Sequence, residues 1–222
     1  MTEHSPGAQV SKAPSRVLSI PNITSFQLYL KYSLLISVLF VMCYGLCNYL
    51  TDYRFNRHAL YWDWELAIPF VPWMIWGYAS MLVLFLFPVF QLDTQRIHRL
   101  GMQLIVAILL ATGCFLIFPA ELGFSRALPE GGYQAVYRFI FMIDYPYNLV
   151  PSLHIVFSSL IILALLETAT PSWKPIYLAW LVIIGVSVIL VHQHHLLDVA
   201  SGLLLALFSR FIIGRLRFAV LA

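Results

Sequence analysis

Six long apolar stretches limit what this 222-residue chain can fold into more than any other feature of its sequence. They cover residues 29–50, 67–90, 101–119, 151–168, 175–193 and 198–219. The hydrocarbon core of a bilayer is about 30 Å thick, and a helix of roughly 20 apolar residues crosses it. Because backbone polar groups in lipid must be bonded within their own segment, such stretches are expected to be helices. We therefore predict an all-α fold, a polytopic membrane bundle of about six transmembrane helices.

The composition supports a membrane protein and argues against several other classes. Hydrophobic residues make up 61% of the chain and charged residues 10%, whereas about 25% of the residues in ordinary soluble domains are charged. The net charge is only +3 and the basic residues are scattered, so no nucleic-acid partner is expected. Cys43, Cys47 and Cys114 lie inside apolar stretches, where cysteine acts as a small hydrophobic residue and no disulfide framework is indicated.

The chain divides into a polar N-terminal part and a membrane part. Residues 1–28 contain several proline and serine residues and lack the apolar core and cleavage site of a secretory signal. We expect residues 1–28 to be a flexible tail and residues 29–222 to be a six-helix transmembrane domain. Neither part indicates an oligomeric state.

The distribution of basic residues predicts an orientation. With a cytoplasmic N-terminus, eight basic residues lie on the cytoplasmic side and four on the opposite side, which agrees with the excess expected there. The two sets are Lys12, Arg16, Lys31, Arg96, Arg99, Lys174, Arg215 and Arg217, and Arg54, Arg57, Arg126 and Arg138.

This orientation collects most of the unusual polar residues on one membrane side. Segments 51–66, 120–150 and 192–198 then share the extracytoplasmic or lumenal side. The expected location is a bacterial inner membrane, or an endomembrane in a eukaryote, with the site facing away from the cytoplasm.

A helix start with anion-binding character opens the fourth apolar stretch. Pro151 suits the first helical turn, and Ser152 and His154 follow it. Free amides at a helix N-terminus form a ready anion site, to which the Ser152 hydroxyl adds a donor. Taken alone, the segment is consistent with an anion-binding site and equally with a plain helix start at which His154 only lies at the membrane interface.

A second group of polar residues, which includes His194 and Asp198, favours a functional site over a plain helix start. His194 and Asp198 are four residues apart, a spacing at which side chains meet on a helix. A carboxylate that accepts a hydrogen bond from one imidazole nitrogen fixes the tautomer and makes the other nitrogen a better base or nucleophile. His195 is adjacent but points about 100° away on a helix, so it is not expected to take part.

The histidines also allow a second interpretation, a metal site. His192, His194 and His195, with His154 and Asp198, offer ligands that suit zinc, although a histidine-rich tract is only a compositional hint.

Arg126, in the 120–150 segment, carries a guanidinium fork that matches phosphate geometry. We predict Arg126 as a phosphate-binding residue.

The sequence resembles the type 2 phosphatidic acid phosphatase superfamily over most of residues 60–205. Asp144–His154 looks like the second motif of that family, and the run from Ser187 through His194 to Asp198 looks like its third. Residues 62–73 resemble the branch that contains the inositol phosphorylceramide synthases and sphingomyelin synthases. The resemblance implies a helical membrane enzyme that acts on lipid phosphates without a cofactor or metal.

By position, the resemblance assigns His194 as the nucleophile that forms a phosphohistidine and Asp198 as its orienting carboxylate. It assigns His154 as the acid that protonates the departing alcohol. The chain departs from the family where the third motif often has arginine and this sequence has Val188, and the basic first motif has no clear counterpart. Arg126 and His192 are the predicted substitutes for binding phosphate.

The expected function is that of a lipid-phosphate phosphatase if water accepts the phosphoryl group, or a phosphotransferase if an alcohol or lipid accepts it. A non-catalytic protein that binds or transports lipid phosphate is the alternative, which the missing arginine keeps open.

Overall fold

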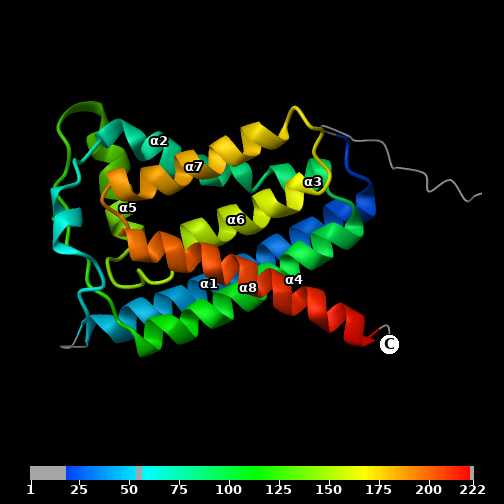
Figure 1. Cartoon of the computed structure of the whole chain (residues 1–222), viewed down its shortest axis with the longest axis horizontal. Helices are drawn as coiled ribbons and strands as arrows, with labels where there is room; N and C mark the ends of the chain where they lie inside the picture. Colours follow the sequence, from blue (N-terminus) through cyan, green and yellow to red (C-terminus); the bar gives the residue numbers. More distant parts are fainter. Residues whose placement is uncertain (1–18, 54–56, 221–222) are drawn as a thin grey trace, which may run out of the picture.

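The computed structural model describes residues 19–53 and 57–220, and their regular elements are all helical, which confirms the predicted all-α class (Figure 1). The α-helices are α1 (Ile23–Asp52), α2 (Ile75–Leu84), α3 (Phe87–Gln91), α4 (Thr94–Ile117), α5 (Gln134–Ile143), α6 (Leu153–Leu166), α7 (Lys174–Leu190) and α8 (Leu196–Val220). Three short 3-10 turns span Asp63–Ala67, Pro72–Met74 and Gly131–Tyr133.

Three of these helices, α1, α4 and α8, are long and apolar enough to cross a membrane. Shorter apolar helices span Pro72–Leu84, Leu153–Leu166 and Lys174–Leu190, so an apolar helix occurs in each of the six predicted stretches. Figure 1 shows them running roughly along one direction, which is the arrangement of a membrane bundle.

The prediction of one continuous helix over residues 67–90 is wrong. Helix α2 ends at Leu84 and α3 begins at Phe87, because Pro88 lacks an amide hydrogen and its ring would clash with the Leu84 carbonyl in a continuous helix. The stretch also begins later than expected, with a 3-10 turn at Pro72.

The first helix begins earlier than predicted. Asn22 caps it by accepting a 2.7 Å hydrogen bond from the Ser25 backbone nitrogen, which satisfies an amide that has no partner within the helix. Residues 23–28 therefore belong to α1 and not to the expected tail. Residues 1–18 of that tail lie outside the described part of the chain.

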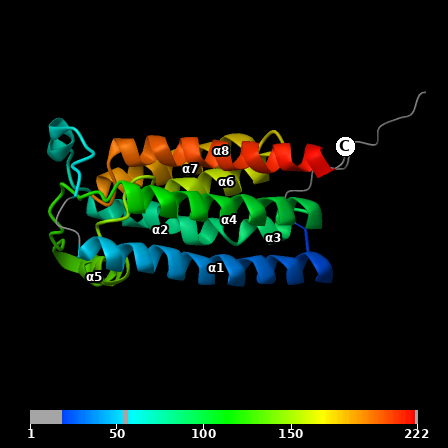
Figure 2. The same ribbon diagram turned by 90° about the horizontal axis from the view of Figure 1, so that it is seen from below.

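Helix α6 is the centre of the bundle and packs against α4, α7 and α8. Most of its side chains are buried, including those of Ser158 and Ser159, as expected for a helix that is apolar on all sides. Seen from below, α1 lies along one edge with α4 beside it, and α8 lies toward the other edge (Figure 2). The outer face of α1 is apolar and exposed, with Val41 at 68% and Met42 at 66%.

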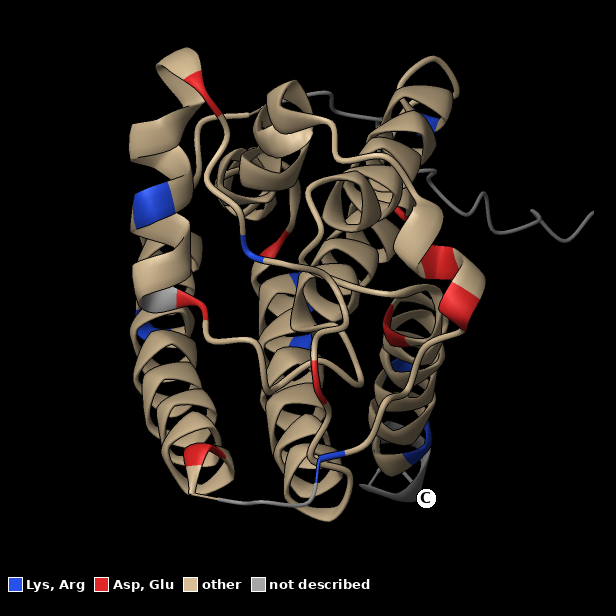
Figure 3. Cartoon of the chain, turned by 90° about the vertical axis from the view of Figure 1, so that its left-hand side faces the viewer, with Lys and Arg blue, Asp and Glu red and all other residues tan. Residues whose placement is uncertain are grey.

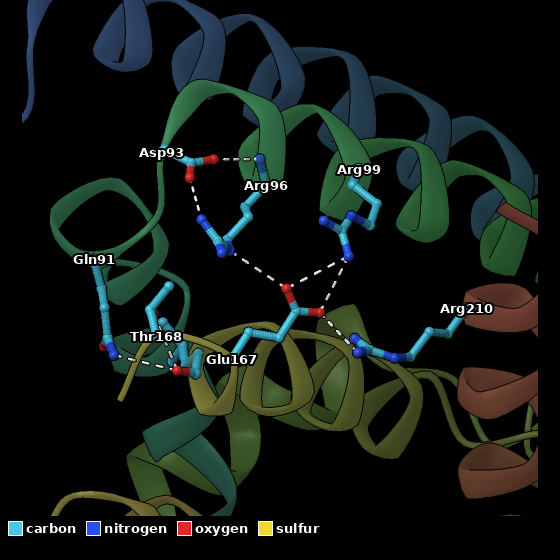
Figure 4. Close-up of polar contacts among 8 residues, drawn as sticks. Gln91, Asp93, Arg96, Arg99, Glu167, Thr168 and Arg210 are labelled. Carbon is cyan, nitrogen blue, oxygen red and sulfur yellow. Dashed lines mark hydrogen bonds and ion pairs between the residues drawn. The ribbon is translucent and has the colours of Figure 1, made fainter. Parts of the chain in front are cut away.

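One end of the bundle is joined by an ion-pair network around Glu167, just after α6 (Figure 4). Its carboxylate lies 3.4 Å from Nε of Arg96, 3.3 Å from Arg99 and 2.7 Å from Arg210. Arg96 and Arg99 belong to α4 and Arg210 to α8, so one carboxylate connects three helices. Such partly exposed pairs contribute about 0–1 kcal/mol each.

The opposite end of the bundle carries the long connections (Figure 1, left). The His58 amide donates to the Pro119 carbonyl at 2.8 Å, and the Tyr147 hydroxyl donates to Asp52 at 2.8 Å. The Leu196 amide also donates to Glu65 at 2.8 Å, so the described residues of segments 51–66, 120–150 and 192–198 gather at one end of the bundle, as predicted. The membrane side that this end faces stays a prediction. Seen from this end, the acidic and basic positions of the described chain are scattered over the helices and the connections (Figure 3).

Candidate active site

The turn between α7 and α8 presents His194 to the bundle interior. The backbone amides of Gln193 and His194 both donate to the Val188 carbonyl at 3.0 Å, so the turn is held against the end of α7. Nδ1 of His194 lies 3.0 Å from Oδ2 of Asp198, and both side chains are buried. An imidazole that donates from Nδ1 keeps a lone pair on Nε2, which leaves that nitrogen free for chemistry.

The predicted pairing is correct, but its local structure differs from the expectation. Helix α8 begins at Leu196, so His194 precedes the helix and does not share a helical turn with Asp198. The same Asp198 Oδ2 accepts the His195 amide at 2.9 Å, the reciprocal half of a helix-capping arrangement. Asp198 thus starts α8 and orients His194 with one oxygen.

His154, the second residue of α6, lies against the same imidazole. Its ring centroid is 5.5 Å from that of His194 at an interplanar angle of 64°, and 4.4 Å from that of Tyr78. Helices α6 and α8 approach closely here because α8 carries Gly202, where a Cβ atom would lie 2.8 Å from the Ser152 carbonyl oxygen. The structure therefore brings together all three residues predicted as catalytic.

Ser152 does not fully match its predicted role. Its backbone amide donates to the Asp198 carbonyl at 3.0 Å, so this amide is not free to bind phosphate as expected. Its hydroxyl is buried and has no hydrogen-bond partner among the described residues. A phosphate contact from the hydroxyl stays a prediction.

Arg126 reaches the same region from the connection after α4. Its guanidinium donates to Gln193 Oε1 at 3.3 Å and lies 4.9 Å from the centroid of the Phe141 ring. Burial lowers the pKa of Arg126, and the charge of Asp144 opposes that shift. A guanidinium nevertheless remains a cation at neutral pH. Its partner Gln193 directly precedes His194 in the sequence.

His192 has a structural contact that the sequence did not predict. Its backbone is left-handed, with φ of 56°, and its Nε2 lies 2.9 Å from the Ile68 carbonyl oxygen. Its ring stacks on Phe124 with centroids 3.9 Å apart. These contacts fix the loop before α2 to the turn, and they give no support to the predicted phosphate-binding role of His192.

Glu65 is a buried carboxylate at this site that sequence reasoning missed. It is fully buried, its Oε2 accepts the Leu196 amide at 2.8 Å, and the same oxygen lies 3.4 Å from Nδ1 of His195. Its other oxygen accepts the Trp62 amide at 3.0 Å. The three-residue spacing of Trp62 and Glu65 is that of a capping pair and was the available signal. His195, stacked between Tyr61 and Phe124, thus belongs to the frame around His194.

The two framing histidines predict a pH-dependent stability. Burial lowers the pKa of both His192 and His195, and for His195 the nearby Asp198 and Glu65 act in the opposite direction without reversing the shift. An unfolded chain binds these protons near its ordinary pKa of about 6.5. Because the unfolded state then holds more protons, the stabilisation is fully present above that pH and is lost as the pH falls below it.

Thermal unfolding in detergent between pH 7.5 and pH 5.5 measures this effect. We expect a lower midpoint at the acid end, and a smaller acid-induced decrease in His195→Gln. The control is His58→Gln, which changes an exposed histidine of the same loop region and should keep the wild-type dependence. Identical pH profiles for wild type and His195→Gln would contradict the assignment.

A cavity of about 490 Å³ adjoins the histidines, and its lining includes His154, His194 and Asp144. Most of the remaining wall is apolar and comes from α1, α2, α5 and α6. A second cavity of about 450 Å³ lies further along α1, and both are lined by Phe40, Val41, Met81, Leu82 and Phe157. The cavity that reaches the histidines therefore shares an apolar wall with the second cavity.

Metal binding has no geometric support in the part of the chain that the structure describes. No three or more histidine, cysteine, aspartate or glutamate side chains there are grouped so that they could hold a metal ion. His194 and His195 are instead engaged with separate carboxylates, Asp198 and Glu65.

Comparison with known proteins adds one positive finding. The family model of the PAP2 superfamily matches residues 58–212, a range that contains every candidate site residue named above. No curated protein matches the chain.

Proposed function

Because the chain belongs to the PAP2 superfamily, whose members are phosphatases and phosphotransferases, we propose that it is a multi-pass membrane enzyme that acts on a lipid phosphate through a phosphohistidine at His194. The observation that carries this proposal is the contact of 3.0 Å between His194 Nδ1 and Asp198 Oδ2, with His154 against the same ring. We further propose the branch that resembles the inositol phosphorylceramide and sphingomyelin synthases.

In the first step, Nε2 of His194 attacks phosphorus and the bond from phosphorus to the leaving oxygen breaks. His154 gives its proton to that oxygen, which leaves as an alcohol. Asp198 keeps the nucleophile oriented and stabilises the positive charge that develops on its ring. Arg126 is the proposed cation for the phosphate oxygens, in place of the family arginine that Val188 replaces.

In the second step, water or an alcohol attacks the phosphohistidine. The phosphorus–nitrogen bond breaks, its electron pair returns to His194, and His154 takes the proton of the attacking hydroxyl. Each residue then has its starting protonation state. Water gives a phosphatase and an alcohol gives a phosphotransferase.

The apolar cavity supports a lipid as the phosphate donor. Val41 of α1 and Leu82 of α2 line both cavities and are 68% and 66% exposed on the outer surface. We propose that a lipid in the membrane enters between α1 and α2 along this apolar wall to reach His194. Apolar walls with a few convergent polar groups are typical of sites that bind apolar ligands.

We propose that the site faces the extracytoplasmic or lumenal side and that the N-terminus is cytoplasmic. Arg96 and Arg99 lie beside Glu167, at the end of α6 opposite to His154. This arrangement agrees with the excess of basic residues expected on the cytoplasmic side. The proposed location is a bacterial inner membrane or a eukaryotic endomembrane.

Trapping of a labelled protein tests the proposal. Detergent-purified protein is mixed with lipid phosphates that carry a radioactive phosphoryl group, and the reaction is quenched in alkali within one turnover. We expect label on the protein that survives alkali and is lost in acid, the behaviour of phosphohistidine, with no effect of a chelator. Turnover of lipid phosphate without any trapped label would contradict the intermediate.

A non-catalytic lipid-phosphate binder is the second candidate. It is favoured by Val188, which is fully buried in α7 where the resembling family often has arginine. Tight binding of a lipid phosphate without phosphate release or transfer, across the same panel, would establish this alternative and exclude the enzyme.

Arg126→Gln is expected to lower kcat/KM for a lipid phosphate. The loss of a hydrogen bond to a charged group predicts a decrease of about 10- to 100-fold, mainly through KM. The measurement is initial rate against substrate concentration in mixed micelles. The control Arg138→Gln changes an exposed arginine on α5 and should stay within about twofold of wild type. Equal constants for both variants would exclude Arg126 as a phosphate-binding residue.

A further inference from the structure

A carboxylate that the proposed reaction does not use lies in the same cavity as the histidines. Asp144 follows α5, and its Oδ1 accepts a hydrogen bond from the Tyr44 hydroxyl while its Oδ2 accepts one from the Tyr78 hydroxyl at 3.0 Å. The two tyrosines come from α1 and α2, and both line the cavity. Each carboxylate oxygen can accept a second hydrogen bond, so two tyrosines do not exhaust the capacity of Asp144.

A side-chain amide from the lining of the same cavity offers a second unused acceptor. Asn148 lines the cavity, is 2% exposed, and donates from Nδ2 to the Tyr44 carbonyl at 2.8 Å. That contact fixes the amide orientation, because a carbonyl accepts only from the NH₂ group. Oδ1 of Asn148 is left buried with no partner among the described residues, and a buried polar atom without a partner is unfavourable, so a ligand that donates a hydrogen bond to it would be favoured.

The two halves of the site therefore have opposite hydrogen-bonding character. His154, His194 and Arg126 supply donors or positive charge, which suit phosphate oxygens. Asp144 and Oδ1 of Asn148 supply only acceptors, which repel a phosphate and suit a group that donates. A hydroxyl is such a group, and an alcohol is the second substrate of a phosphotransferase.

Charge favours a neutral donor over a cation. The carboxylate of Asp144 already acts on the Arg126 guanidinium, in the direction that opposes the effect of burial on the Arg126 pKa. A ligand ammonium would compete with this cation, whereas a hydroxyl donates to Asp144 without changing the charge of the site.

We propose that Asp144 and Asn148 form a binding subsite for the hydroxyl group of an acceptor alcohol, which makes the chain a phosphotransferase and not only a phosphatase. This inference rests on the proposed function. The alcohol oxygen attacks the phosphohistidine, the phosphorus–nitrogen bond breaks, and the alcohol proton goes to His154. Asp144 accepts a hydrogen bond from the acceptor and does not remove its proton.

Product partition and binding test the subsite in purified wild type, Asp144→Asn and Tyr44→Phe. A labelled short-chain lipid phosphate is the donor, and glycerol or diacylglycerol is the acceptor, which separates a water-soluble alcohol from a lipid one. The ratio of transfer product to free phosphate depends only on the second step. Wild type should transfer to one acceptor, and Asp144→Asn should lower the ratio about tenfold, the size expected for one hydrogen bond to a charged group.

Tyr44→Phe is the matched control, because it removes one hydroxyl that contacts Asp144 and keeps the carboxylate. If Asp144 only connects α1 to α2, both variants will lower hydrolysis and transfer together and leave the ratio unchanged. That result, or a wild type that forms only free phosphate with both acceptors, overturns the inference.

Binding without donor separates this inference from the proposed reaction. Quenching of tryptophan fluorescence measures the dissociation constants of diacylglycerol and of its methyl ether, which lacks the donor hydroxyl. The subsite predicts that wild type prefers the free hydroxyl about tenfold and that Asp144→Asn loses this preference, even if no lipid phosphate is turned over. Equal binding of the alcohol and the ether by wild type rejects the subsite.

Discussion

Replacing His194 by asparagine is expected to abolish turnover and the alkali-stable label together. The nucleophile contributes to both steps, and losses of about 10⁴-fold or more follow when such a residue is removed from a catalytic group. Asparagine is close to histidine in polarity and keeps an amide near Asp198, so the turn between α7 and α8 should still form. The measurement is phosphate release and transfer from the preferred lipid phosphate beside the trapping assay.

The control is His98→Gln, at the far end of the bundle, where Nδ1 of His98 contacts the Tyr32 hydroxyl at 2.6 Å. It should keep activity and label, because its contacts are remote from His194. If His194→Asn retains both turnover and the alkali-stable label, His194 is not the nucleophile, and His154 is the next candidate. Loss of label with normal turnover would instead favour direct attack by water.

The helical class and the positions of the six apolar helices were predictable because the apolar stretches are long and continuous, whereas α5 lies in segment 120–150, where no helix was expected. The ends were less predictable, since they depend on single residues. Asn22 starts α1 before the apolar stretch begins, and Pro88 breaks the second stretch. Hydropathy averages over many residues and does not register either effect.

At the site, the distance along the sequence decided what could be predicted. His194 and Asp198 are close in sequence, and the contact between them was expected and found. Glu65 contacts Leu196, and Asp144 contacts Tyr44 and Tyr78, across separations of 131, 100 and 66 residues. No local spacing indicates such contacts, because they arise only when α1, α2 and the connecting loops pack together.

The loop before α2 shows what this packing adds. Glu65 and His192 attach it to the turn that carries His194, through contacts with the Leu196 amide and the Ile68 carbonyl. In the sequence, residues 62–73 indicated only a resemblance to one branch of the family and no role at the site. In the structure, this segment helps to position His194 through its contacts with the turn between α7 and α8, which gives its sequence a physical reason.

Asp198→Asn is expected to lower kcat by about 10³- to 10⁴-fold, the size measured when the orienting carboxylate of a histidine is made neutral. One oxygen of Asp198 accepts from both His194 and the His195 amide. Asparagine can keep the cap at the start of α8 through its oxygen, but it cannot stabilise positive charge on His194. The amount of label trapped in the first turnover should fall with kcat, because the first step is the one affected.

Stability separates this role from a purely structural one. Losing part of the cap costs about 1 kcal/mol, which lowers the unfolding midpoint slightly and leaves most of the protein folded at assay temperature. Ser201→Ala, one turn further along α8, removes a hydroxyl that donates to the Leu197 carbonyl at 2.7 Å and is the matched control for the helix. If Asp198→Asn loses activity only in proportion to the fraction unfolded, Asp198 is a helix cap and His194 acts without it. If Asp198→Asn is folded but inactive, activity depends on the negative charge of Asp198 beside the imidazole, because asparagine keeps the helix cap and lacks that charge.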